Sequence, residues 1–176
     1  MTDDIVLASM MVSVTQILSI IFILFLTLKK YYSWFFLFAA QASWFVYSIY
    51  IDKFDIIALI VICISVAALS FTWRNSEFGF STIKEKYICF GITLIAFGSC
   101  FLSPADNILK VNEVVFQLLT IEGLAFLAFK TIDGWVLLAI ANLFYWQDTI
   151  SDTITVIVLG TLIYGFGIYN WKKELT

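Results

Sequence analysis

The sequence predicts an all-α membrane protein, in which seven transmembrane helices form two parallel three-helix repeats joined by an inverting helix. The first observation is composition. Hydrophobic residues make up 62% of the 176 residues and charged residues 13%, against about 45–50% and about 25% in soluble domains. A soluble domain of this size could not bury so much apolar surface, so a soluble enzyme is excluded. The other two observations are recurring uncharged stretches and an internal repeat.

Each predicted span is an uncharged or nearly uncharged stretch between charged segments. A helix needs about 20 apolar residues to cross a bilayer, with a range of about 17–25. The first stretch is too long for the apolar part of a signal peptide, and Asp3 and Asp4 precede it instead of basic residues. It is therefore expected to remain a helix. The predicted spans are about 5–28, 34–51, 56–73, 87–105, 112–129, 134–150 and 153–171.

The positive charges predict a multi-pass protein of the cell membrane, with the N-terminus outside and the C-terminus in the cytoplasm. Cytoplasmic loops carry an excess of Lys and Arg, and this orientation leaves only Lys53 and Lys110 outside. The cytoplasmic side then holds Lys29, Lys30, Arg74, Lys84, Lys86, Lys130, Lys172 and Lys173. Four Trp fall at the cytoplasmic helix ends, as in an interfacial aromatic belt: Trp34, Trp73, Trp135 and Trp171.

The chain also resembles itself. The segment SWFFLFAAQASWF, from Ser33, aligns with GWVLLAIANLFYW, from Gly134. A lysine precedes each segment (Lys30, Lys130), an acidic turn follows each, and the next span ends in Trp and a base. Two copies in one orientation require an odd number of spans between them, here one inverting span. The expected domains are a first bundle (1–76), a linker with the inverting helix (77–110) and a second bundle (111–176).

Polar residues deep in these spans are candidates for a substrate site, which in repeat transporters lies near the midplane. Gln41 and Asn142 align, and each lies seven residues, or about 10 Å, from the aligned Trp. Trp44 is one turn beyond Gln41 and shares its face, as Tyr145 and Trp146 do with Asn142. An amide beside a ring can bind a polar, ring-bearing ligand. The alternative is a hydrogen bond between packed helices.

Two later spans add candidates. Gln117 and Thr120 share a face, and Glu122 is a charge deep in the same span. A charge at this depth is a functional candidate; the alternatives are a protonated carboxyl or a donor partner elsewhere. Tyr164 lies on a glycine-rich face that permits close packing of helices. The predicted substrate-binding residues are Gln41, Trp44, Gln117, Thr120, Glu122, Asn142, Tyr145, Trp146 and Tyr164.

Other kinds of site have little support in the sequence. The chain has no His, and its three Cys show no metal-ligand spacing. The net charge of −3, without a basic cluster, argues against nucleic-acid binding. No cofactor, metal or enzymatic activity is expected.

The repeat segments resemble those of the PnuC-type vitamin transporters, whose best-known substrate is nicotinamide riboside. The ending YGFGIYNW, from Tyr164, is similar to the family's last helix. The resemblance implies a SWEET-like fold, and uptake by facilitated diffusion as two bundles rock to give alternating access. It also implies a homotrimer, coupling to a cytoplasmic kinase, and polar core positions at Gln41, Gln117, Thr120, Asn142 and Tyr164.

The chain also departs from the family pattern. The aromatic motif that ends the family's third helix keeps only Phe71 and Trp73, and Glu122 is additional. Relatives carry thiamine, riboflavin or deoxynucleosides, so substrate identity stays open. The alternatives to a transporter are a seven-helix sensor or receptor, and a structural membrane subunit. A retinal-binding sensor is excluded because the last span has no Lys in its interior.

Overall fold

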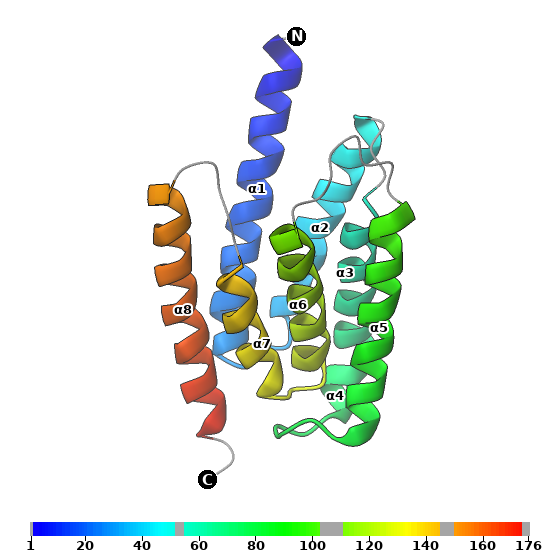
Figure 1. Cartoon of the computed structure of the whole chain (residues 1–176), viewed down its shortest axis with the longest axis vertical. Coiled ribbons are helices and arrows are strands. Elements are labelled where there is room, and N and C mark those ends of the chain that lie inside the picture. Colours follow the sequence, from blue (N-terminus) through cyan, green and yellow to red (C-terminus); the bar gives the residue numbers. More distant parts are fainter. Residues whose placement is uncertain (1, 52–54, 103–110, 145–149, 174–176) are drawn as a thin grey trace. The chain divides into compact units, whose positions relative to one another are not determined.

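The computed structural model describes residues 2–51, 55–102, 111–144 and 150–173. Each predicted span corresponds to a helical segment of the described residues, so the predicted all-α fold class is confirmed (Figure 1). The third span is continuous from α3 through a π-helical stretch into α4. The elements are α1 (Thr2–Thr27), α2 (Ser33–Tyr50), α3 (Ile56–Ala67), the π-helical stretch (Ala68–Thr72), α4 (Trp73–Asn75), α5 (Ile83–Leu102), α6 (Val111–Ala128), α7 (Asp133–Asn142) and α8 (Ile150–Lys172).

Two of the described helical segments have the length and apolar character that a bilayer requires. Ser9–Thr27 and Ile56–Asn75 have mean hydropathies of 2.3 and 2.6 and are each long enough to cross a membrane. The segment Val114–Ala128 of α6 is a shorter apolar stretch. Since the bilayer supplies no hydrogen-bond partners, the helix is the form that satisfies the backbone of these segments internally.

The two largest differences between the predicted spans and the described helices lie at the start of α5 and at the end of α7. Helix α5 begins at Ile83, before the predicted 87, because Thr82 and Glu85 form a capping box. The Glu85 carboxylate accepts a hydrogen bond from the Thr82 N–H at 2.7 Å, and the Thr82 hydroxyl accepts one from the Glu85 N–H at 3.3 Å. Helix α7 ends at Asn142, well before the predicted 150. Its backbone tightens there, since the N–H of Phe144 donates to the carbonyl of Ala141 at 2.8 Å.

The chain divides into two compact units, Met1–Arg74 and Asn75–Thr176. In the first unit, α2 packs against both α1 and α3. In the second unit, α7 packs against both α6 and α8, and α5 packs against α6. Within each unit, therefore, the helix that carries the repeated segment is the middle member of three packed helices.

A pair of Trp rings marks the same place in each unit. Trp34 at the start of α2 meets Trp73 edge-to-face at 6.2 Å between centroids, and Trp135 at the start of α7 meets Trp171 at 5.6 Å. Trp34 and Trp135 are 0% exposed. The predicted aromatic belt is therefore wrong for these four rings, because a belt requires rings at the membrane-facing surface and these pack inside the units. The matching pairs support the internal repeat.

The turn before each middle helix is also repeated. Lys29 and Lys130 have positive φ angles of 58° and 57°, and each ends its helix in the left-handed conformation typical of a Schellman cap. The true counterpart of Lys130 is therefore Lys29, whereas the sequence alignment had paired it with Lys30. The backbone hydrogen bonds of the two caps also correspond. The N–H of Lys29 donates to the Leu26 carbonyl at 2.9 Å, as the N–H of Lys130 does to the Leu127 carbonyl at 2.9 Å. The N–H of Lys30 donates to the Phe25 carbonyl at 3.0 Å, as the N–H of Thr131 does to the Phe126 carbonyl at 3.1 Å.

Candidate functional site

In the first unit, α2 presents an amide and an indole one turn apart. The Trp44 indole N–H donates to Asp55 Oδ2 at 2.8 Å. The other carboxylate oxygen of Asp55 accepts from the Ala58 N–H at 3.0 Å and so caps the start of α3. The Gln41 side chain is half-buried and hydrogen-bonds to no residue that the structure describes. A free amide thus lies next to an indole whose orientation is fixed.

Asp55 is a residue whose role the sequence prediction missed. It was read only as part of an acidic turn, although its place directly before an apolar run is the sequence signature of an N-cap. Its second bond, to Trp44, joins two helices and could not be seen in the local sequence.

In the second unit, Asn142 joins α7 to α8. Its side chain is 4% exposed, and Nδ2 donates to the Ile157 carbonyl at 2.8 Å and to Thr161 Oγ1 at 3.5 Å. Gly160 allows this contact, because a Cβ there would lie 2.6 Å from Asn142 Oδ1. Asn142 therefore makes the interhelical bond that was the alternative reading of this residue, while Oδ1 accepts no hydrogen bond from a described residue.

Tyr164 lies near Asn142's helix contact and beside a buried indole. Its ring centroid is 6.3 Å from that of Trp135. Gly167, one turn further along α8, also faces Trp135, since a Cβ at that position would lie 2.7 Å from the indole. Gly160 and Gly167 of the last span therefore serve the packing of α8 on α7, whereas a Cβ at Gly165 would meet no neighbour within 4 Å.

The candidates on α6 do not all face one site. Gln117 and Thr120 are half-buried, and the Thr120 hydroxyl donates to the Phe116 carbonyl at 2.7 Å. Glu122, two residues on from Thr120, lies on a different side of the helix. Tyr145 and Trp146 fall outside the described residues. The sequence thus predicted one site, whereas the second unit distributes its predicted residues over separate faces.

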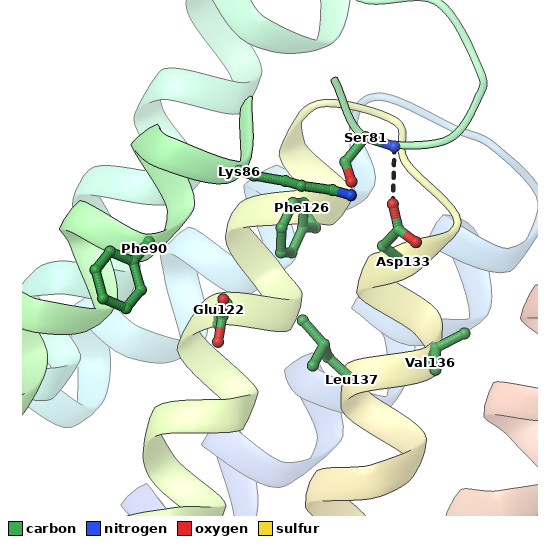
Figure 2. Close-up of a pocket in the computed structure, with 8 residues that line it drawn as sticks. All are labelled: Ser81, Lys86, Phe90, Glu122, Phe126, Asp133, Val136 and Leu137. Carbon is green, nitrogen blue, oxygen red and sulfur yellow. Dashed lines mark hydrogen bonds between the residues drawn. The ribbon is translucent and has the colours of Figure 1, made fainter. Parts of the chain in front are cut away.

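Glu122 lines a pocket formed by α5, α6 and α7. The pocket has a volume of about 410 Å³, within the range of about 300–1,000 Å³ typical of small-ligand sites. Figure 2 shows Glu122 and Phe126 on α6, Phe90 on α5 and Leu137 on α7 around it. Lys86, Ser81 and Asp133 line it near the starts of α5 and α7, where the Ser81 N–H donates to Asp133 Oδ2 at 2.7 Å.

The segment 76–81, which we call the strap, runs along the turn between α6 and α7. Gly79 forms an isolated parallel bridge with Thr131. The Lys130 ammonium donates to the Ser76 carbonyl at 2.8 Å and lies 5.2 Å from the centre of the Phe78 ring. Burial lowers the pKa of the Lys130 ammonium from its ordinary value. Phe78 in turn meets the Trp171 ring at 5.1 Å, so the strap ties the turn to the end of α8.

The described residues bring together no group of three His, Cys, Asp or Glu side chains that could hold a metal ion. The polar groups of the candidate residues are instead amides, hydroxyls, indoles and a few separate charges. Such groups recognise an uncharged or singly charged organic molecule by hydrogen bonding and ring contact.

Of three comparisons with known proteins, the search of solved structures gives a match. No protein-family model matches the chain, and no curated protein matches it in sequence. The chain is similar to the crystal structure of the vitamin B3 transporter PnuC, with a TM-score of 0.66 and 14% sequence identity over 94% of this chain and 81% of that one. The chain therefore has the fold of that membrane transporter.

Proposed function

We propose that the protein is a membrane transporter for a small, polar, ring-bearing vitamin precursor, with nicotinamide riboside as its substrate. The observation that carries the proposal is the similarity over 94% of the chain to a vitamin B3 transporter. The repeated turns and Trp pairs support it, because transporters of this kind are built from repeats that move against each other. The same proposal has four further parts: transport by facilitated diffusion, alternating access of the two bundles, a homotrimer, and trapping of the product by a cytoplasmic kinase.

Gln41 and Trp44 are the substrate contacts that the geometry favours most. The Gln41 amide has no hydrogen-bond partner among the described residues, and a ribose hydroxyl or a carboxamide would satisfy its donors and acceptors. The Trp44 indole is held by Asp55 and offers its face to a planar ring. The second unit contributes four corresponding groups to the proposal: Asn142 Oδ1, Tyr164, Gln117 and Thr120.

The test is binding and uptake of nicotinamide riboside, with thiamine, riboflavin and a nucleoside for comparison. Gln41→Leu should weaken nicotinamide riboside binding by roughly 5- to 150-fold, since leaving a polar partner unsatisfied costs about 1–3 kcal/mol. Gln16→Leu in α1 is the matched control, because Gln16 is exposed and lies outside the proposed contacts. No uptake of any of these compounds by the wild-type protein in proteoliposomes would contradict the transporter proposal.

A further inference from the structure

The pocket between α5, α6 and α7 contains an unpaired carboxylate. The Glu122 side chain accepts no hydrogen bond and forms no ion pair with any residue that the structure describes. Asp133 differs, since one of its oxygens is occupied by the Ser81 N–H. A half-buried carboxylate without a partner is costly, so the chemistry that completes this site is a cation.

The walls of the pocket favour an organic cation over a bare metal ion. Phe90 and Phe126 contribute aromatic rings, and Val136 and Leu137 contribute apolar surface. Ring faces attract cations, whereas a divalent metal requires several oxygen ligands. The Ser81 hydroxyl oxygen is buried and has no partner, so it is available to a polar substituent of the ligand.

Lys86 sets the charge balance at the mouth of the pocket. Its ammonium lines the same pocket as Glu122 and forms no ion pair with a described residue. The formal charges of Glu122, Asp133 and Lys86 sum to −1, which one bound monovalent cation offsets. Lys86 itself must then oppose the binding of that cation, so removing its charge should strengthen binding.

We propose that this pocket binds a small monovalent organic cation with a planar ring, held by Glu122 and its aromatic walls. Nicotinamide riboside is such a cation, because its pyridinium nitrogen carries a permanent positive charge. That the ligand is the transported molecule rests on the proposed function. The pocket lies at the lysine-bearing helix ends, so it would be a second substrate site on the predicted cytoplasmic side.

The test uses two probes that differ in charge and little in shape: 1-methylnicotinamide, a cation, and nicotinamide, which is neutral. Affinities are measured on the purified full-length protein in nanodiscs. Glu122→Gln removes the carboxylate's attraction for the cation and should weaken 1-methylnicotinamide binding by roughly five- to thirtyfold, and Lys86→Met should strengthen it severalfold. Binding of nicotinamide should change in neither variant. The two variants should change the cation's affinity in opposite directions, which separates an effect of charge from a general loss of folding.

Matched controls are available at the same end of the second unit. Glu77→Gln removes an exposed carboxylate, and Lys84→Met removes an exposed ammonium, and neither residue lines the pocket. Both should leave the cation's affinity unchanged. Equal affinity of 1-methylnicotinamide for wild type and Glu122→Gln would overturn the pocket proposal. If only Gln41→Leu lowered the affinity for the cation, the cation would bind at the transport site only. The proposed function would then survive without this second site.

Discussion

Two amides that align in the sequence have different surroundings in the structure. Gln41 has no described partner, whereas Asn142 is bonded to the backbone of α8. The cause is Gly160, which lets α8 approach the amide closely. An alignment records residue type and depth but not the distance to the next helix. The sequence therefore found both residues, and could not show that one of them also holds two helices together.

Asn142→Leu should lower the stability of the folded protein, and Gln41→Leu should not. The lost interhelical bond is worth about 0.5–1.5 kcal/mol, and about 1 kcal/mol corresponds to a melting temperature about 2–4 °C lower in a protein of this size. The measurement is thermal unfolding of both variants without substrate. Equal melting temperatures for the two would show that the bond from Asn142 to Ile157 contributes nothing measurable.

At the scale of elements, the sequence predicted the number, order and approximate positions of the helices. It could do so because the hydrocarbon core fixes the length of a span and excludes charge. It could not place ends set by single hydrogen bonds, such as the Thr82–Glu85 capping box. The π-helical stretch Ala68–Thr72 was also not visible, because one wide turn leaves the apolar pattern of the span intact.

The lysines that end α1 and α6 offer a comparison between the two repeats. Both hold a left-handed backbone, which costs a non-glycine residue about 1–2 kcal/mol and suits glycine. Glycine should relieve this backbone cost at both positions. Lys130→Gly also loses the bond to Ser76 and the contact with Phe78, so it should stabilise the protein less than the backbone cost alone predicts.

Chemical or thermal unfolding of the two glycine variants measures this difference. Lys130→Met is a useful control, since it keeps the backbone preference of a side-chain residue and removes only the ammonium. A Lys130→Met variant as stable as the wild type would mean that the bond from the Lys130 ammonium to Ser76 adds nothing measurable to the stability of the second unit.

At the scale of the whole molecule, the two units repeat a common plan, to which the second unit adds α5 and the strap. Each unit has a positive-φ lysine, a buried Trp at the start of its middle helix and a second Trp at the end of its third span. The strap bonds to the turn at Lys130. A repeat predicts what two copies share; the strap lies between them in the sequence, and so no alignment of the copies could reveal it.

The orientation of the chain in the membrane remains a prediction from charge, and fusions test it. With eight Lys and Arg assigned to one side and only Lys53 and Lys110 to the other, the positive-inside rule places Thr176 in the cytoplasm. A reporter that is active only in the cytoplasm should work when fused after Thr176 and fail when fused after Ile51. A reporter active only outside should give the reverse pattern. External activity of the reporter at Thr176 would contradict either the predicted orientation or the predicted number of spans, because seven spans put the two ends of the chain on opposite sides. A second fusion, after Asn75, would decide between these two errors. Asn75 must lie on the same side of the membrane as Thr176 if the third and seventh spans run in the same direction.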